Sequence, residues 1–516
     1  MYPEYIKPSF SGTWIGTSPP SGELLGEYSI DGSPIKVYDV DGQMVYYILP
    51  SEYAFSDKFV NAMKKFPDFL MKNTSDIDIS DADAIRNYVD SGAIRFLDTL
   101  ELPDEEARVF PHIARKYTVG YGVMEVLFKD RHIQDIFVDA PSTDRITVNL
   151  SGISGSESGL AVTNMRISEE ESNSLLTRIK YFTGSAFGYK KPVMETSLND
   201  FPVRVTIIGP PMSTNGISMA FRRHSTTPWT LPMLVYNQTI PLGISGYLSI
   251  LPYANMSILI AGTRGSGKTS LLTALLSEFP PDQRIISIED TVEIPVDDLR
   301  DCGVKIISLS ADGESVDPES ALKVSLRMGD TAYVMGEVRG KEAKTLYEAM
   351  RTGTAGSSVL ATIHADSPES VRTRIIDDLG VTPGAFESTD VIIMLEPFRP
   401  AGKRRFMRRL TRITEIQNGE MTDIFRINEG FNISKSKVIR KLSDKWEVKP
   451  EHIYRDMNFR KDIVAYIVNM MNGGNYSAGE MEGVSMSRKA YNVCKENGVY
   501  DINRWLNYYG GNNDNI

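Results

Sequence analysis

The stretch AGTRGSGKTS (residues 261–270) decides how the fold of this chain is interpreted. From Gly262 it matches the pattern G-x-x-x-x-G-K-[S/T] in full, and it lies between an apolar segment, SILIAG, and a helix-like segment, KTSLLTALLSEF. Glycines let backbone N–H groups turn toward phosphate oxygens, and the start of the following helix adds positive partial charge. The stretch therefore predicts a phosphate-binding loop between a buried strand and a helix.

Residues of this loop have separate expected roles. Lys268 is expected to reach the β- and γ-phosphates of a nucleotide, and the hydroxyl of Thr269 is expected to ligate Mg²⁺. The expected nucleotide-binding set is the whole segment: Gly262, Thr263, Arg264, Gly265, Ser266, Gly267, Lys268, Thr269 and Ser270. Because kinases, motors, switches and recombinases share such a loop, it does not identify the reaction.

Strand-like and helix-like segments alternate around the loop, from residue 244 to residue 430. This alternation predicts an α/β domain with a parallel sheet and helices on both faces. Two α+β domains are expected before it, over 1–110 and 111–228. A linker is expected over 229–243, within a segment (225–243) that holds three prolines. A mostly helical, polar tail is expected over 431–516.

Composition excludes several classes of protein. A net charge of -11 over 516 residues disfavours nucleic acid as the main partner. The two cysteines, Cys302 and Cys494, form no C-x-x-C pair and suggest no zinc site. We see no signal peptide at the N-terminus, and no apolar stretch approaches the ~20 residues that span a bilayer.

Three further motifs follow the loop in order. RIISIEDTVEI (284–294) is a strand that ends in acidic residues, VMGEVRG (334–340) is a strand that ends in Gly-Glu, and ATIHADSP (361–368) is a strand that delivers His364 to the edge of the sheet. Carboxylates at the end of a core strand are costly unless a metal, water or cation meets them. Each motif alone is compatible with a solvated strand end or a structural histidine.

Taken together and in this order, the four motifs resemble those of the secretion ATPase superfamily, which includes the motors of type II secretion, type IV pili and the archaellum. There they are called Walker A, Asp box, Walker B and His box. The resemblance implies a RecA-like P-loop ATPase core preceded by a smaller α+β domain and assembled as a hexameric ring. The chain lacks the four-cysteine insert of many bacterial members, and residues 117–141 resemble the archaeal members.

The resemblance also implies roles in ATP hydrolysis. Walker B in this family ends in Gly-Glu, so Glu337 is expected to orient and polarise the attacking water. Mg²⁺ would depend on Thr269 and phosphate oxygens, with Glu289 or Asp290 assisting, and Asp290 and Glu337 are counted with Thr269 as its expected ligands. His364 is expected near the γ-phosphate. Glu337, Glu289 and His364 are thus expected catalytic residues.

Arginines complete the expected site. The family draws them from the N-terminal domain, which points to Arg204 and Arg222 as catalytic cations and, with less support, to Arg223. A solvated strand edge is the alternative for Arg222 and Arg223. Arg339 is compatible with a structural role. The basic run GKRRFMRRL (402–410) is expected to be a charged strand face, with acidic lipid headgroups or an acidic partner as the alternative.

The resemblance implies a mechanochemical ATPase that acts on an integral membrane platform protein and drives assembly of a type IV pilus-like filament, either an adhesion pilus or an archaellum. It would be cytoplasmic and peripheral at the inner face of the membrane. Two alternatives remain open. One is an ATPase of a conjugation-type DNA or protein secretion system, and the other is a regulatory protein that binds ATP with little turnover.

Overall fold

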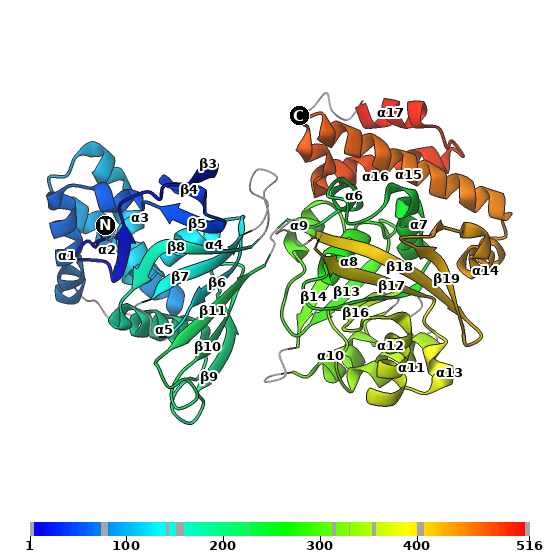
Figure 1. Ribbon diagram of the computed structural model, residues 1–516, viewed down its shortest axis with the longest axis horizontal. Helices are drawn as coiled ribbons and strands as arrows, with labels where there is room; N and C mark the ends of the chain where they lie inside the picture. Colours follow the sequence, from blue (N-terminus) through cyan, green and yellow to red (C-terminus); the bar gives the residue numbers. More distant parts are fainter. Residues whose placement is uncertain are drawn as a thin grey trace. The chain divides into compact units, whose positions relative to one another are not determined.

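The chain divides into two compact units in the computed structural model, and each is described by itself (Figure 1). Unit 1 comprises residues 1–224 and 401–405, and unit 2 comprises residues 225–400 and 406–516. The structure describes residues 5–73, 81–140, 144–150, 159–224, 227–311, 316–329, 331–352, 358–399 and 407–510.

Unit 1 contains one continuous sheet with the strand order β3-β4-β5-β8-β7-β6-β11-β10-β9, to which β2 adds through β8 and β1 through β2. The strands are β1 (Tyr5–Ile6), β2 (Thr13–Gly16), β3 (Glu23–Ile30), β4 (Ser33–Val40), β5 (Gln43–Ile48), β6 (Ile133–Val138), β7 (Arg145–Leu150), β8 (Gly159–Ile167), β9 (Val193–Ser197), β10 (Val203–Ile208) and β11 (Ser218–Arg223). β5 and β8 pair in parallel, with Met44 opposite Ala161.

Three helices of unit 1, α1 (Asp57–Lys72), α2 (Ala82–Leu97) and α3 (Asp104–Thr118), form a separate aromatic core. The other two, α4 (Met124–Lys129) and α5 (Glu169–Thr183), contribute to the core of the sheet itself. Phe59 and Phe66 of α1 meet Phe110 of α3 edge to face, with ring centroids 5.5 and 6.0 Å apart. Apolar residues at three- and four-residue spacing therefore face one another, as helical periodicity requires.

Unit 2 is built on a second sheet with the order β14-β13-β15-β16-β12-β17-β18-β19-β20. Its strands are β12 (Ser257–Gly262), β13 (Arg284–Glu289), β14 (Lys305–Ser310), β15 (Ala332–Met335), β16 (Val359–Ile363), β17 (Val391–Phe398), β18 (Met407–Gln417), β19 (Glu420–Arg426) and β20 (Gly430–Phe431). Pairs from β14 to β17 are parallel, and those from β17 to β20 are antiparallel.

Both faces of the parallel part of this sheet are buried. Ile258 and Ile260 of β12 enter one apolar core, and the alternate residues Leu259 and Ala261 enter the other. The first core includes residues of α6 (Leu231–Tyr236), α7 (Leu242–Tyr253) and α8 (Lys268–Leu276), and the second those of α10 (Pro318–Ser325), α11 (Glu342–Thr352), α12 (Pro368–Thr373) and α13 (Pro383–Phe386). The shorter α9 (Val296–Asp301) precedes β14. This is the RecA-like α/β architecture that the sequence predicted.

C-terminal helices pack on the first of these faces. They are α14 (Lys437–Lys445), α15 (Pro450–Asn472) and α16 (Met481–Glu496), and α17 (Ile502–Gly510) packs in turn against α15 and α16 (Figure 1). Arg460 of α15 is 6% exposed, and it donates from Nη1 to the Ser249 hydroxyl of α7 at 2.8 Å and from Nε to Asp456 at 3.3 Å. The helical tail is therefore an integral part of unit 2.

Domain boundaries in the structure differ from the sequence-based division at two places. Residue 110, expected to end one domain, lies inside α3, and the sheet of unit 1 joins strands from both expected N-terminal domains. The expected linker over 229–243 contains α6 and belongs to unit 2. Its prolines are compatible with helix because Pro232 occupies the first turn of α6, where its missing N–H would be unpaired in any case.

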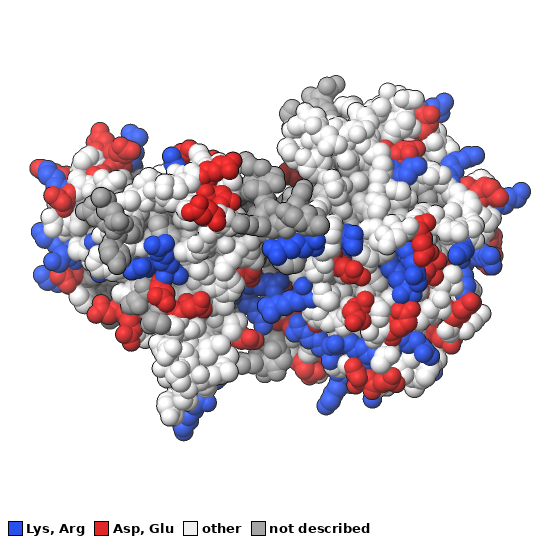
Figure 2. All heavy atoms as spheres, viewed as in Figure 1, with Lys and Arg blue, Asp and Glu red and all other residues white. Residues whose placement is uncertain are grey.

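No helix within the described ranges has both the length and the apolar character needed to span a membrane. Figure 2 shows acidic and basic side chains interspersed over the visible face of unit 2. This mixture is typical of a protein surface in contact with water.

Candidate active site

The phosphate loop joins β12 to α8 at the carboxyl end of the sheet, as the motif predicted. Gly265 and Gly267 have φ values of +75° and +94°, and Gly267 is the N-cap residue of α8. L-residues with side chains rarely adopt this left-handed conformation, whereas glycine adopts it at little cost. The loop therefore turns its backbone into a concave surface at the start of a helix, which suits an anion.

Lys268 lies along the inside of this loop. Its side chain is largely buried, and Nζ donates hydrogen bonds to the carbonyl oxygens of Gly262 and Thr263, both at 3.1 Å. Nζ also lies 3.5 Å from Nδ1 of His364, at the end of β16. The ammonium group is thus held where phosphate oxygens would replace the carbonyl contacts.

A chain of polar contacts runs on from His364 to the Walker B and Asp box residues. Nε2 of His364 lies 3.4 Å from Oε1 of Glu337, which follows β15. Oε2 of Glu337 accepts a hydrogen bond from Arg339 at 2.6 Å, and the other guanidinium nitrogen of Arg339 bonds Asp290 at 2.8 Å. The structure therefore brings together Lys268, His364, Glu337 and Asp290, which the sequence had grouped.

Protonation states follow from these contacts. Burial alone would raise the pKa of Glu337, but the hydrogen bond and charge of Arg339, with His364 and Lys268, hold it below its usual value. Burial and the nearby Lys268 lower the pKa of His364. Because Lys268 only donates, Nδ1 of the neutral imidazole faces it as the acceptor and Nε2 carries the proton toward Glu337. Glu337 is thus an ionised acceptor at neutral pH.

Glu289 at the end of β13 has a different environment. It is 2% exposed, and burial raises its pKa to about 7 even though Oε1 accepts backbone hydrogen bonds from Glu293 and Ile294. Oε2 of Glu289 has no hydrogen-bond partner among the described residues. The hydroxyl of Thr269 donates to Glu293 at 3.0 Å, which connects the phosphate loop to the Asp box.

Gly336 allows the ends of these strands to lie close together. A Cβ atom at this position would lie 3.0 Å from Cγ of Glu289, tighter than nine in ten real Cβ contacts. The Thr362 hydroxyl of β16 donates to the Gly336 carbonyl at 2.5 Å, and the Thr362 carbonyl accepts from Val338 N–H at 2.9 Å. These bonds fix the backbone on both sides of Glu337.

The expected catalytic arginines belong to unit 1. Arg204 of β10 and Arg222 of β11 are cross-strand neighbours, and Arg204 pairs with Glu195 at 3.1 Å. Arg222 is exposed. Arg223 has a different environment, since Nε donates to the Asp130 carbonyl and Nη1 to the His224 carbonyl, both at 3.0 Å. Burial lowers the pKa of Arg223, and these bonds give it a role in holding the backbone.

The basic run 402–410 lies partly outside the described residues, which resume at Met407. Arg409 of β18 stacks over the Phe398 ring at 4.1 Å from its centroid. Arg408 donates from Nε to the Gly265 carbonyl of the phosphate loop at 2.8 Å. The described end of this run is therefore a strand, as expected, but one of its arginines contacts the loop.

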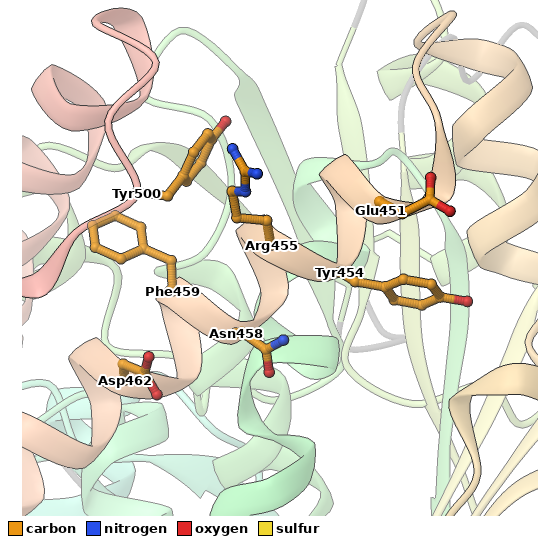
Figure 3. A pocket seen from close by; sticks show the side chains of 7 residues that line it. All are labelled: Glu451, Tyr454, Arg455, Asn458, Phe459, Asp462 and Tyr500. Carbon is orange, nitrogen blue, oxygen red and sulfur yellow. The ribbon is translucent and has the colours of Figure 1, made fainter.

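A shallow hollow of about 400 Å³ lies elsewhere in unit 2, on the C-terminal helices (Figure 3). Residues of α15 and one aromatic residue before α17 line it: Glu451, Tyr454, Arg455, Asn458, Phe459, Asp462 and Tyr500. It includes no part of the phosphate loop and none of the four motifs, so the candidate active site is distinct from it.

Comparison with known proteins identifies the family. The sequence profile of the type II/IV secretion system protein family matches residues 194–420. An uncharacterized protein of Methanocaldococcus jannaschii is 32% identical over 231 residues, which are 42% of this chain and 84% of that protein. This chain belongs to the type II/IV secretion ATPase superfamily. The match extends from β9 through β18, so it covers both the phosphate loop and the three motifs that follow it.

Two further proteins are similar to this chain. A putative conjugal transfer protein of Mycobacterium tuberculosis is 27% identical over 292 residues, covering 55% of this chain and 79% of that protein. Among solved structures, the Legionella pneumophila ATPase DotB is 16% identical, with a TM-score of 0.42 over 66% of this chain and 87% of that chain. Membership in a family of ATPases implies that the secretion ATPase binds nucleotide.

Sequence reasoning missed two side chains of this secretion ATPase site. Arg339 was interpreted only as compatible with a structural role, although it joins Glu337 to Asp290. Glu293 was given no role, although it accepts from Thr269. The available signal was spacing: Arg339 lies two residues after Glu337, and Glu293 lies four residues after Glu289. Whether residues at such spacings contact each other depends on the geometry of the turn between them.

Proposed function

We propose that this chain is an ATP-hydrolysing motor that powers assembly of a type IV pilus-like surface filament. The observation that carries the proposal is the chain of contacts from Lys268 through His364 to Glu337. It connects Lys268, which would contact the phosphates, to the ionised carboxylate of Glu337. A regulatory protein that only bound ATP would not need His364 and Glu337 in this arrangement.

Nucleotide binding is assigned to the loop from Gly262 to Ser270. Its backbone N–H groups and the α8 N-terminus would surround the phosphates, and Lys268 would exchange its bonds to loop carbonyls for bonds to the β- and γ-phosphates. The buried Ser266 hydroxyl has no hydrogen-bond partner among the described residues. A polar atom left in this state is expected where a ligand supplies the missing partner.

Hydrolysis is assigned to Glu337 and His364. Glu337 would accept a hydrogen bond from the attacking water and hold its lone pair in line with the γ-phosphorus. Nε2 of His364 lies 3.4 Å from Oε1 of Glu337, so arrival of the γ-phosphate beside Lys268 would change the surroundings of all three groups. Loss of phosphate after hydrolysis reverses this change, which is a means of coupling chemistry to movement.

The residues present fit Mg²⁺ as a companion of ATP. No group of three or more His, Cys, Asp or Glu side chains in the described part of the chain could hold a metal alone. Mg²⁺ commonly binds through one or two protein oxygens together with substrate phosphates and waters. Thr269 would hold it, with Asp290, Glu289 or Glu337 close by, and the unpartnered Oε2 of Glu289 suits a cation or its water. When bound, it would neutralise charge that develops on the phosphates.

Stabilisation of the negative charge that develops in the transition state is assigned to Arg204 and Arg222 of unit 1. They would act within a subunit or from a neighbour in a homohexameric ring. An added arginine of this kind is worth about three to five orders of magnitude in rate. Where these arginines come from a neighbour in the ring, activity should rise with protein concentration as rings form, because the site of a single chain is then incomplete.

The proposed cargo is a filament of the archaeal type IV pilus or archaellum kind. The motor would act from the cytoplasm, peripheral at the inner face of the membrane, on an integral membrane platform protein. Charge and the sequence resemblance support protein partners over nucleic acid. A direct contact with acidic lipid through the run 402–410 remains part of this proposal.

Replacement of Glu337 by Gln in the cell of origin tests the cargo. Surface filaments are imaged and swimming is scored, with Glu348→Gln, an exposed carboxylate of α11, as the matched control. Loss of swimming together with its filament identifies an archaellum motor, and loss of adhesive filaments alone identifies a pilus motor. Survival of every filament would contradict the proposed cargo.

A conjugation-type secretion ATPase is the second candidate, favoured by the similarity to a putative conjugal transfer protein. It would use the same residues for hydrolysis. In the experiment above, intact filaments combined with loss of DNA or protein transfer would select it.

A further inference from the structure

One basic side chain beside the His box, that of Arg374, has no anionic partner in the described part of the chain. Arg374 begins a single π-helical turn (Arg374–Asp378) that continues α12, and its carbonyl accepts a hydrogen bond from Leu379 N–H at 3.0 Å. Its Nε atom is buried without a hydrogen-bond partner, and no ion pair joins its guanidinium group to a carboxylate among the described residues. A buried polar atom in this state is expected where a ligand supplies the missing partner.

Other arginines near α12 are accounted for. Arg372 lies two residues earlier and is exposed, so water solvates its charge. Arg412 of β18 bonds Glu369 of α12 at 2.8 Å and Asp423 of β19 at 2.7 Å. Of these three described arginines, Arg374 alone has neither a carboxylate partner nor an exposed position.

The segment that carries Arg374 is anchored beside the strands that deliver the Walker B and His box residues. α12 begins four residues after His364, so a short connection joins it to the end of β16. Ile375, the next residue, belongs to the same apolar core as Met335 and Ile363, which are the last residues of β15 and β16. Arg374 is therefore held close to the edge of the sheet from which His364 emerges.

The charge of Arg374 acts on the candidate site. Burial and the nearby Lys268 are the main causes of the lowered pKa of His364, and the positive charge of Arg374 acts in the same direction. Nδ1 of His364 also lies 3.5 Å from Nζ of Lys268. Three basic side chains are thus gathered at one place, and because like charges repel, their arrangement favours the arrival of an anion.

Chemistry and location indicate which anion this is. In the proposed function, the γ-phosphate lies beside His364 and Glu337, while the phosphates that remain after hydrolysis lie in the loop. Guanidinium groups bind phosphate oxygens in a forked geometry that lysine does not reproduce. ADP carries no phosphate group at the γ-position. An arginine next to His364 therefore suits the terminal phosphate of a nucleoside triphosphate.

We propose that Arg374 binds the γ-phosphate of the nucleotide and so makes the site prefer a triphosphate to a diphosphate. This inference rests on the proposed function, since it takes the loop to be a nucleotide site. Arg374 belongs to the same unit as the loop, so it acts on the nucleotide of its own chain. An unpaired, partly buried cation destabilises the nucleotide-free protein, and the γ-phosphate removes this penalty.

The test compares two nucleotides on the full chain: fluorescent ADP, and a fluorescent ATP analogue in which nitrogen replaces the oxygen between the β- and γ-phosphorus atoms. Arg374→Met removes the charge but keeps an apolar stem. It is expected to weaken the ATP analogue about tenfold or more, which is the effect of losing one charge-assisted hydrogen bond, and to leave the affinity for ADP within about twofold. Arg374→Lys keeps the charge but loses the fork, so it is expected to restore part of the affinity for the analogue.

Arg372→Met is the matched control, because it removes the same charge from an exposed position of the same segment. It is expected to leave both affinities unchanged. Unchanged affinity for the analogue in Arg374→Met, or equal losses in Arg374→Met and Arg372→Met, would overturn the assignment while leaving the proposed function intact. Absence of nucleotide binding by the wild-type chain would overturn both.

Urea unfolding without nucleotide separates binding from folding. Because the guanidinium group of Arg374 has no partner to lose among the described residues, Arg374→Met is expected to be at least as stable as the wild-type chain. A clear loss of stability, combined with equal weakening of ADP and of the analogue, would show that Arg374 holds the fold and would overturn its assignment to the γ-phosphate.

Discussion

Glu289 is expected to make the stability of unit 2 depend on pH in an unusual direction. Burial raises its pKa from 4.5 to about 7. At about 1.4 kcal/mol per pH unit, this shift corresponds to a destabilisation of about 3 kcal/mol once the group is ionised. The side chain is 2% exposed, so solvent screens little of this cost.

The sign follows from proton binding. Below about pH 4.5 the carboxyl is protonated in both states and costs nothing. Between that pH and 7 the unfolded chain has released the proton while the folded protein still holds it, so the free energy of unfolding falls as pH rises. Above pH 7 the full cost is present in the folded protein.

Comparison of Glu289→Gln with the wild-type chain isolates this effect, because both proteins carry every other titrating group. Urea unfolding is followed by tryptophan fluorescence, to which unit 2 contributes Trp229, Trp446 and Trp505. Between pH 5 and pH 8 the variant should gain about 2 to 3 kcal/mol relative to wild type. The same difference between the two proteins at both pH values would refute the reasoning.

Three further substitutions test other contacts. Gly336→Ala should lower turnover and destabilise unit 2 by about 1–3 kcal/mol in urea unfolding, because the added Cβ would lie 3.0 Å from Cγ of Glu289; normal turnover and stability would contradict the close packing. Arg460→Ala should destabilise unit 2 by about 3–5 kcal/mol, since it leaves the buried Asp456 without its cation; a loss below about 1 kcal/mol would argue against this ion pair. Lys268→Ala should abolish detectable ATP binding in equilibrium titration, and unchanged affinity would contradict the assigned loop.

Local patterns predicted unit 2 because its decisive signals are short in sequence. The phosphate loop fixes a strand before it and a helix after it. The alternation of Ile258 and Leu259 between two cores reflects a strand that is covered on both faces. The Asp-Gly pairs at 31–32 and 41–42 were likewise identifiable as turns between adjacent strands of unit 1.

Long-range pairing is what the sequence did not show. The parallel contact of β5 with β8 places Met44 opposite Ala161 and merges two expected domains into one sheet. Nothing local in either strand specifies that partner. Prolines were also misleading, because Pro232 in the first turn of α6 follows the N-cap Thr230, whose hydroxyl accepts from Met233 N–H at 3.3 Å.

The candidate site likewise combines residues that the sequence grouped correctly with contacts that it did not predict. Motif order was sufficient to group Lys268, Glu337 and His364, because parallel strands deliver their carboxyl ends to one edge of the sheet. The contacts of Arg339 with Glu337 and Asp290 were not predicted, since they depend on which of several neighbouring polar groups this long side chain reaches. Such a choice is made by packing and is not encoded in spacing.

Steady-state phosphate release by the assembled chain tests the central claim most directly. Wild type, Glu337→Gln and the control Glu348→Gln are compared at saturating Mg²⁺ and ATP, with nucleotide binding measured in parallel. The account predicts turnover in the wild type and in the control. The Glu337→Gln variant should bind ATP with near-normal affinity but release phosphate at least about a hundredfold more slowly. Wild-type turnover in Glu337→Gln would contradict the assignment of Glu337 and, with it, the mechanism built on the chain from Lys268 to His364.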